Sequence, residues 1–376
     1  MKIGFDISQT GNGKAGCGFL AYSLGSALAV AQEMEEMVCF RTFGSDWWDP
    51  ENQWLTLPVS SSVVRYALGY ENHRDAAGFW GQPGELIEAM LPDMDIIHSN
   101  NFWCLPRMPR VKQVYTLHDM TVFECPEYST EPNRIACANG VARAAAWADF
   151  IVANSRFTLD NFLDYFPFDK HRVAVIPLAS RFTANSIDAV RPKLLHSKVG
   201  RFLLSVGTIE PRKNYDGLLE AFQVLSRSHD VHLVIAGRPG WNMPEFQSVV
   251  IARGLINRVT CLYAASDEEL CWLYRNCAAF LCLSLWEGFG MPVIEAMSQG
   301  CPIVASAVSS IPEVLGHAGI LVDPTHAEGI VVAVDRLMRD SPYCTRLGIA
   351  ARERANLFEW STAAGIVNDI YRELVP

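Results

Sequence analysis

The chain has 376 residues, of which 50% are hydrophobic and 19% are charged. This length predicts about two domains, and the composition excludes long disordered or low-complexity segments. The formal net charge of -10 argues against a protein whose main task is to grip nucleic acid, because such proteins usually carry a basic excess.

The acidic excess is concentrated in the first half of the chain. Residues 1–178 include 13 basic and 21 acidic residues, a net charge of -8, and the remainder has a net charge of -2. Binding of a phosphate group is therefore electrostatically easier in the second half. The eleven cysteines include no Cys-x-x-Cys pair, which favours buried free thiols over a metal cluster.

The N-terminal region predicts a cytoplasmic protein with no membrane span. The uncharged stretch from Ala15 to Gln32 contains glycines and serines, which favour a buried helix over a bilayer span. Lys2–Ser8 alternates like a strand and is interrupted by Asp6, which is unlike a signal peptide.

Twelve short apolar runs predict strands, with helical patterns such as Asp216–Ser228 and Asp267–Asn276 between them. Strands that alternate with helices at this spacing predict βαβ units, and the two similar halves predict two doubly wound domains facing across a cleft. The expected strands are Lys2–Ser8, Met37–Phe43, Asp95–Asn100, Lys112–Asp119, Asp149–Ser155, Arg172–Leu178, Arg201–Gly207, Val231–Gly237, Arg258–Tyr263, Ala278–Ser284, Pro302–Ser306 and Gly319–Asp323.

The domain boundary is expected between Pro177 and Lys198, where the sequence has two prolines, few large apolar residues and no clean periodicity. The predicted domains are residues 1–180 and 196–357. In open α/β sheets, ligands bind outside the carboxyl ends of the strands. Candidate functional residues are therefore sought directly after the predicted strands.

A glycine-rich segment follows the first strand. Residues 11–16 match the G-x-G-x-x-G pattern of dinucleotide sites. However, residues 8–10 separate the glycines from the strand, and no acidic residue is placed for a ribose before Asp46. We favour a ligand-facing loop in which Gly16 and Gly18 let the backbone approach a phosphate or sugar at a helix N-terminus, with a plain flexible turn as the alternative.

Asp93 and Asp95 form a D-x-D pair, which binds a divalent metal in some sugar transferases. Here the pair directly precedes the apolar run that begins at Ile96, so we expect Asp95 to open a strand instead. No metal site is predicted.

His118 closes the fourth predicted strand, within the segment VYTLHD. A histidine at the carboxyl end of a strand is well placed to touch a substrate in a cleft, although a hydrogen-bonded interior histidine is the alternative. His98 follows the third strand in a similar way, and we favour it less.

Two adjacent cations follow the first strand of the second half. In Gly207-Thr-Ile-Glu-Pro-Arg212-Lys213-Asn, arginine offers a planar fork and lysine a compact charge to the oxygens of a diphosphate. From spacing alone, a solvated basic turn that caps the next helix is an equal alternative.

The segment Leu285–Ala296 carries the most specific pattern. Gly288 and Gly290 allow close backbone approach, and the helix expected from about Pro292 would present free N–H groups to an anion. Glu287 is expected in the loop before this helix and Glu295 in its first turn. Two carboxylates placed in this way suit sugar and ribose hydroxyls.

The sequence EGFGMPVIEA, with glutamates eight residues apart, resembles the signature of the retaining glycosyltransferases of family 4, which have the GT-B fold. GTIEPRKN, the Gly16–Gly18 segment, TLHD and the strand end Val152–Ser155 are similar to further landmarks of that family, in order over nearly the whole chain. The resemblance implies that residues 1–180 bind the acceptor, that residues 196–357 bind a nucleotide-diphosphate sugar, and that a C-terminal helix, residues 358–376, packs back on the first domain.

The resemblance also implies roles for individual residues. Arg212 and Lys213 would bind the diphosphate near Gly207, and Glu295 would bind the ribose. Glu287 would hold hydroxyls of the donor sugar, and His118 would lie beside the anomeric centre. The catalytic set is then His118, Arg212, Lys213 and Glu287, and the further donor-binding residues are Gly16, Gly18, Gly207, Gly288, Phe289, Gly290, Met291 and Glu295. The chain departs from the family in lacking the basic residue often found just after Gly18, so part of the phosphate contact expected from that side is missing.

The expected activity is retaining, metal-independent hexosyl transfer with no cofactor beyond the nucleotide-sugar donor. GDP-mannose is slightly favoured over a UDP-hexose, and the acceptor is a glycan, a lipid-linked glycan or a small molecule. A nucleotide-sugar epimerase or hydrolase on the same fold, or a nicotinamide-dependent oxidoreductase, is the alternative. A patch such as Arg107, Arg110 and Lys112 could support weak peripheral contact with the inner membrane face, although the first half is acidic.

Overall fold

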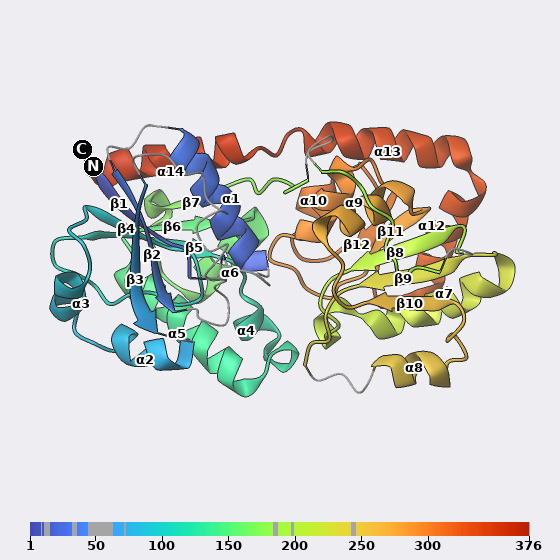
Figure 1. Ribbon diagram of the computed structural model, residues 1–376, viewed down its shortest axis with the longest axis horizontal. Coiled ribbons are helices and arrows are strands. Elements are labelled where there is room, and N and C mark those ends of the chain that lie inside the picture. The colour runs from blue at the N-terminus through green and yellow to red at the C-terminus, as the bar shows by residue number, and fades with distance from the viewer. Residues whose placement is uncertain are drawn as a thin grey trace. The chain divides into compact units, whose positions relative to one another are not determined.

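The computed structural model of the chain describes residues 1–8, 10, 16–31, 36–43, 63–70, 73–182, 187–196, 199–241 and 246–375. Contacts divide the chain into two compact units (Figure 1). The first unit comprises Met1–Glu124, Glu131–Leu178 and Glu359–Pro376. The second comprises Cys125–Thr130 and Ala179–Phe358.

The first unit is built on a parallel sheet of seven strands in the order β3-β2-β1-β4-β5-β6-β7. Its strands are β1 (Lys2–Asp6), β2 (Glu36–Phe43), β3 (Val63–Tyr70), β4 (Ile96–Ser99), β5 (Lys112–Leu117), β6 (Phe150–Ala153) and β7 (Val173–Val175). Its helices are α1 (Gly16–Val30), α2 (His73–Trp80), α3 (Gly84–Met90), α4 (Thr121–Glu124), α5 (Glu131–Trp147), α6 (Arg156–Tyr165) and α14 (Trp360–Leu374), with a short 3-10 turn at Lys170–Arg172.

The second unit repeats this plan with six parallel strands in the order β10-β9-β8-β11-β12-β13. Its strands are β8 (Phe202–Val206), β9 (His232–Ala236), β10 (Val259–Leu262), β11 (Ala279–Cys282), β12 (Ile303–Ser306) and β13 (Ile320–Val322). Its helices are α7 (Tyr215–Ser228), α8 (Phe246–Ala252), α9 (Asp267–Asn276), α10 (Met291–Ser298), α11 (Ile311–Leu315), α12 (Ala327–Arg339) and α13 (Ser341–Ala355), with 3-10 turns at Pro126–Tyr128 and Pro211–Lys213.

Buried apolar strands explain why both sheets form. Helices α7 and α12 have amphipathic patterns, and their buried residues pack with those of β8, β9 and β11 in one hydrophobic cluster. In the first unit, one cluster joins β2 and β4 to α2 and α3, and another joins β5 and β6 to α5 and α6. The predicted α/β class with two doubly wound sheets is therefore confirmed.

All twelve predicted strands are present, with ends within one to three residues of those predicted. The prediction missed β3, which pairs with β2 and, among the described residues, lies at the edge of the first sheet. A strand at an edge is not enclosed by neighbours on both sides, so its sequence need not be continuously apolar. Arg65 and Gly69 interrupt the apolar run of Val63–Tyr70, so the sequence pattern did not predict this strand.

Each sheet has one switch point, where the strand order reverses. It lies between β1 and β4 in the first sheet and between β8 and β11 in the second. Loops that leave adjacent strands in opposite directions at this point leave room for a ligand beyond the carboxyl ends. The residues after β1, β4, β8 and β11 are therefore the places to examine for chemistry.

The C-terminal helix α14 belongs to the first unit and packs against α1, although most of the second unit precedes it in sequence. Figure 1 shows α14 in red beside the blue α1. Ala363, Val367 and Tyr371 are fully buried on its inner face. This helix is therefore part of the core of the first unit and not an appendage.

The stretch from Pro177 to Lys198, where the domain boundary was expected, is largely part of the second unit. Phe182 and Leu195 are buried, and the backbone N–H of Val190 donates to Glu268 O. Lys198, the end of the expected interval, lies outside the described residues. The division between the units, at Leu178 and Ala179, lies inside the expected interval, and the rest of the described stretch belongs to the second unit because isolated apolar residues can anchor a chain without periodicity.

All eleven cysteines are free thiols, and six of them are buried. Sulfur atoms of Cys277 and Cys301 lie 3.1 Å apart in the second unit. Of the helices in the described part of the chain, none has the length and apolar character needed to cross a bilayer.

Candidate active site

The switch point of the second sheet brings the loops after β8 and β11 together. Gly207 is the first residue after β8. Its φ is +148, and a Cβ there would lie 3.3 Å from Lys213 Cε. The backbone N–H of Leu285 donates to Arg212 O at 2.8 Å, which joins the two loops. The basic turn Pro211–Lys213 and the segment around Glu287 therefore lie side by side at this switch point.

Arg212 and Lys213 both hold the carboxylate of Glu287. Arg212 Nη1 donates to Glu287 Oε2 at 2.8 Å, and Lys213 Nζ donates to Glu287 Oε1. Arg212 Nη1 also donates to Trp286 O at 2.8 Å, while Nη2 forms an ion pair with Glu210 at 2.7 Å. Side-chain exposure is 18% for Arg212, 12% for Lys213 and 8% for Glu287, so the cluster is largely desolvated.

Serine side chains fix Glu287 further. Ser284 Oγ donates to Oε1 at 2.7 Å, Ser309 Oγ accepts from the Glu287 N–H at 3.0 Å, and Ser310 Oγ donates to Glu287 O at 2.9 Å. Burial raises the pKa of Glu287, but the Lys213 ammonium and the Arg212 guanidinium outweigh it and lower the pKa to about 2. Glu287 is therefore ionised throughout the physiological range.

These contacts correct the solvated-turn alternative for Arg212 and Lys213. A solvated turn would contribute little to stability, whereas here two cations compensate the buried carboxylates of Glu210 and Glu287. Burial raises the pKa of Glu210, against the opposing effect of Arg212 and Lys213. Removing either cation is expected to destabilise the fold, because it leaves a buried charge less well paired.

Helix α10 begins beside this cluster. Its N-cap is Gly290, with φ 98, and a Cβ at this position would lie 2.6 Å from Ile311 Cδ1, so both backbone and space require glycine. Phe289 is buried, and Met291 is the first helical residue. The first turn of a helix has N–H groups with no partner inside the helix, and these can bind an anion.

The structure places Glu295 in the second turn of α10, not in the first turn as predicted. The helix begins at Met291, one residue before Pro292. Glu295 is therefore too far from the N-terminus for a simple helix-dipole role. Its burial needs another explanation.

Arg181 and Tyr274 provide that explanation. Arg181 Nε donates to Glu295 Oε1 at 2.7 Å, and Tyr274 OH donates to Oε2 at 3.0 Å. Arg181 also pairs with Asp267 at 2.7 Å and stacks on Phe182 at 4.5 Å from the ring centroid. Burial raises the pKa of Glu295, against the opposing effect of Arg181. Each carboxylate oxygen can accept more than one hydrogen bond, so the group remains able to bind a hydroxyl.

In the first unit, His118 follows β5 directly and is buried. Its Nε2 lies 2.8 Å from Asn100 O, and its ring lies against Phe102. Asn154 Nδ2 donates to His118 O at 2.6 Å, which fixes the backbone as well. Burial lowers the pKa of His118. Asn100 follows β4 at the switch point, so the histidine is anchored where a ligand would bind.

His98 is a structural residue. It lies inside β4 and is fully buried, with both ring nitrogens hydrogen-bonded to Tyr371 and Thr116. Burial lowers its pKa to about 3, with a further contribution from His118.

Gly16 and Gly18 lie in the first turn of α1 and not in a loop. The prediction read these glycines as a turn signal, but the apolar stretch continues the helix back to Gly16. The preceding glycines of the G-x-G-x-x-G pattern, Gly11 and Gly13, and Asp46 lie outside the described residues.

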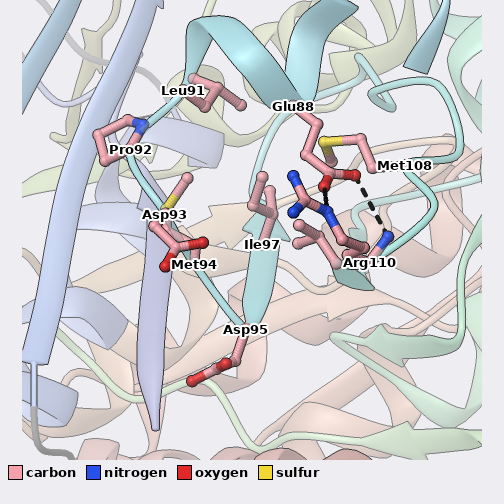
Figure 2. A pocket seen from close by; sticks show the side chains of 10 residues that line it. Glu88, Leu91, Pro92, Asp93, Met94, Asp95, Ile97, Met108 and Arg110 are labelled. Carbon is pink, nitrogen blue, oxygen red and sulfur yellow. Dashed lines mark hydrogen bonds and ion pairs between the residues drawn. The ribbon is translucent and has the colours of Figure 1, made fainter. Parts of the chain in front are cut away.

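Asp93 and Asp95 lie at the amino ends of the strands of the first sheet, whereas His118 lies at the carboxyl ends. They line a hollow of about 170 Å³ at the start of β4, shown in Figure 2, in which Asp95 points away from the ion pair of Glu88 and Arg110. Asp95 Oδ2 accepts from the Lys2 N–H at 2.7 Å, which confirms the expectation that it opens a strand. Across the described ranges, three or more His, Cys, Asp and Glu side chains nowhere gather as they would around a metal ion.

Sequence reasoning missed the residues that hold the glutamates. Glu210, Ser284 and Arg181 were given no role, and neither was Tyr274. The alternation of charge in Glu210-Pro-Arg212 was a usable signal, because a carboxylate two residues from a cation suggests a pair. Nothing in the sequence connected Arg181 with Glu295, which is 114 residues away.

Sequence models of two protein families match this chain: "Glycosyltransferase Family 4" over residues 29–179 and "Glycosyl transferases group 1" over residues 186–354. The chain belongs to the family 4 glycosyltransferases. A curated relative, the O-antigen chain mannosyltransferase B of Escherichia coli, is 29% identical over 396 aligned positions that span the whole of both chains.

Solved structures show that this family 4 glycosyltransferase has the GT-B fold. A sucrose-phosphate synthase from Thermosynechococcus elongatus matches with a TM-score of 0.77 and 21% identity, covering 100% of this chain and 99% of that one. HepE from Anabaena, in complex with UDP and glucose, matches with a TM-score of 0.72 and 18% identity, covering 99% and 100%. The predicted family and fold are thus confirmed.

Proposed function

We propose that the enzyme transfers a hexosyl group, with mannosyl favoured, from a nucleotide-diphosphate sugar to a glycan, lipid-linked or small-molecule acceptor with retention of anomeric configuration. The observation that carries the proposal is the placement of Arg212, Lys213 and the N-terminus of α10 at one switch point. The name of the Escherichia coli relative, a mannosyltransferase of O-antigen chains, supports transfer of mannose, for which we favour GDP-mannose as the donor. The UDP and glucose bound to HepE keep a UDP-hexose as the next choice.

The cluster suits departure of a diphosphate. When the glycosyl–phosphate bond breaks, negative charge grows on the leaving oxygen. Buried carboxylates hold Arg212 and Lys213 in place before the donor arrives, so their N–H groups need no rearrangement as this charge develops. Lysine has three donors, so Lys213 can keep Glu287 and still donate to a phosphate oxygen.

The remaining roles are those that the resemblance to the family implies. Glu287 would hold hydroxyls of the donor sugar, and Glu295, oriented by Arg181 and Tyr274, would bind the ribose. N–H groups of Phe289–Met291 would contact the donor, and His118 would lie beside the anomeric centre. An acceptor hydroxyl would attack on the face that the diphosphate leaves, and its proton would pass to the departing phosphate oxygen.

Nucleotide binding tests this proposal. Thermal denaturation is followed with GDP, GDP-mannose, UDP, UDP-glucose and NAD, since a ligand that binds the folded state raises the melting temperature. We expect the largest rise with GDP or GDP-mannose. Free sugar released without acceptor would indicate an epimerase or hydrolase, and stabilisation by NAD alone would indicate an oxidoreductase.

Transfer is expected to persist in excess EDTA. The reason is that Arg212, Lys213 and the start of α10 can stabilise the leaving group without a metal, and that Asp93 and Asp95 lie at the amino ends of their strands, away from the carboxyl ends where ligands bind. The measurement is the initial rate with and without the chelator. Loss of activity that manganese or magnesium restores would contradict metal independence.

A further inference from the structure

A chain of buried hydrogen bonds runs from the C-terminal helix to His118, entirely within the first unit. Its members are Tyr371 on α14, His98 on β4, Thr116 on β5 and Asn100 after β4. The contacts are 2.5 Å between Tyr371 OH and His98 Nδ1, 2.8 Å between His98 Nε2 and Thr116 Oγ1, and 2.9 Å between Thr116 Oγ1 and Asn100 Oδ1. All four side chains are buried.

The orientation of the Asn100 amide follows from its partners. Its Nδ2 donates to Asp6 O at 3.1 Å and to His98 O at 3.3 Å, and both partners are carbonyls that can only accept. Oδ1 is therefore the acceptor that faces Thr116. The Thr116 hydroxyl donates its single hydrogen to this oxygen.

The positions of the protons on His98 and Tyr371 then follow from the direction of the Thr116 hydrogen bond. Because Thr116 Oγ1 must accept from His98, Nε2 of His98 carries the hydrogen. Burial holds the pKa of His98 at about 3, so the ring is neutral and Nδ1 has a lone pair. Tyr371 OH donates to it. Every member of the chain donates in the same direction, an arrangement in which hydrogen bonds reinforce one another.

The far end of this chain meets His118. Asn100 O can only accept, so His118 Nε2 carries a hydrogen and Nδ1 is left as the unprotonated nitrogen of the neutral ring. Three hydrogen bonds, to Asp6 O, His98 O and Thr116 Oγ1, hold the Asn100 side chain. They therefore also restrain the backbone carbonyl of Asn100. The tautomer and the position of the His118 ring are thus set by the Asn100 carbonyl, which this network holds in place.

We propose that Tyr371 is a positioning residue for His118, acting through His98, Thr116 and Asn100. The inference rests on the proposed function, in which His118 lies beside the reacting carbon. It gives the C-terminal helix a second role beyond packing, because its tyrosine anchors the network behind the site. A ring displaced by about 1 Å can cost about 100-fold in rate, so a distant anchor can matter.

The first experiment compares Tyr371→Phe with Tyr115→Phe. Both tyrosines are buried in the first unit, but the Tyr115 hydroxyl has no hydrogen-bond partner among the described residues, which makes it a matched control. We expect Tyr371→Phe to lower kcat by about 10- to 100-fold with donor KM changed less than about twofold. Tyr115→Phe should leave both unchanged. A normal kcat in Tyr371→Phe would overturn the proposal.

A second pair of variants guards against simple loss of folding. Thr116→Ser keeps the hydroxyl, and Thr116→Val removes it at the same volume. Serine should retain most of kcat and valine should lose it to the same extent as Tyr371→Phe. If both variants behave alike, the hydroxyl chain has no role in positioning.

Coupling to His118 separates positioning from general damage. In a His118→Ala background, Tyr371→Phe should have no further effect on kcat. An equal fold-loss in both backgrounds would show that Tyr371 acts on something else.

An activity-independent readout separates this inference from the proposed function. Nitrogen NMR of histidine-labelled protein, with His118 assigned from its absence in His118→Gln, should show Nε2 protonated and Nδ1 bare in the wild type. Tyr371→Phe should mix the tautomers. If no sugar donor supports turnover but this spectrum holds, the network stands and the proposed function fails. An Nδ1-protonated ring in the wild type would overturn the network itself.

Discussion

Replacing Glu287 by glutamine is expected to lower the free energy of unfolding by about 3 kcal/mol at pH 7. The variant leaves Arg212 and Lys213 without their shared carboxylate in a largely desolvated site, and breaking a buried pair from one side typically costs about 3–5 kcal/mol. The neutral amide retains the volume and one acceptor, so the lower end of that range applies. The measurement is denaturant unfolding followed by circular dichroism.

The pH dependence provides a sharper test of the same pair. The pKa of Glu287 in the folded protein is about 2, below its ordinary value of 4.5, so the carboxylate contributes stability above pH 4.5. This contribution is lost as the pH falls from 4.5 towards 2, by about 1.4 kcal/mol per pH unit. The difference between wild type and Glu287→Gln should therefore be constant from pH 7 to pH 5 and shrink below that.

Glu220→Gln is the control for this series. Glu220 lies exposed on α7 in the same unit, so its variant changes the net charge equally without touching the cluster. It should match the wild type within about 0.5 kcal/mol at every pH. A Glu287→Gln protein that is as stable as this control at pH 7 would show that the cations are adequately solvated without the carboxylate.

Most of the fold was predictable because buried parallel strands are continuously apolar. Leu203 and Leu204 in β8 and the run Leu233–Ile235 in β9 are fully buried, so the short apolar runs in the sequence coincide with the strands. The edge strand β3 is not continuously apolar, so the same argument did not find it. Helix α1 was expected correctly over most of its length, but its first turn was read as a loop because Gly16 and Gly18 are turn formers.

The residues of the site were predictable only where they are adjacent in sequence or belong to one short motif. Arg212 and Lys213 are adjacent, and Glu287 belongs to a recognisable segment, so each could be named from the sequence. Their mutual pairing could not be predicted, since 75 residues separate Arg212 from Glu287. The contact between His98 and Tyr371 spans 273 residues and depends on α14 returning to the first unit. Long-range pairing of this kind is set by topology.

Replacing Lys213 by methionine is expected to lower kcat by about 10²- to 10³-fold, with a much smaller change in donor KM. The lysine is held by Glu287 before the donor arrives, and charge develops on the diphosphate mainly in the transition state. A preorganised donor aimed at developing charge is typically worth about 3–4 kcal/mol. Saturation kinetics with the nucleotide sugar identified by thermal shift give kcat and KM separately.

Stability is the competing explanation for such a loss, and it can be separated. Removing Lys213 leaves Glu287 with Arg212 alone, so the pKa of Glu287 should rise from about 2 and the protein should lose about 1–3 kcal/mol of stability. Lys193→Met, at an exposed lysine of the same unit, controls for loss of a charge. Kinetics measured well below the melting temperature of the variant then report the site and not the folded fraction. If Lys213→Met shows the stability loss but turns over normally, the basic pair serves to bury Glu287, and the leaving group must draw its positive charge from the N-terminus of α10 or from a metal.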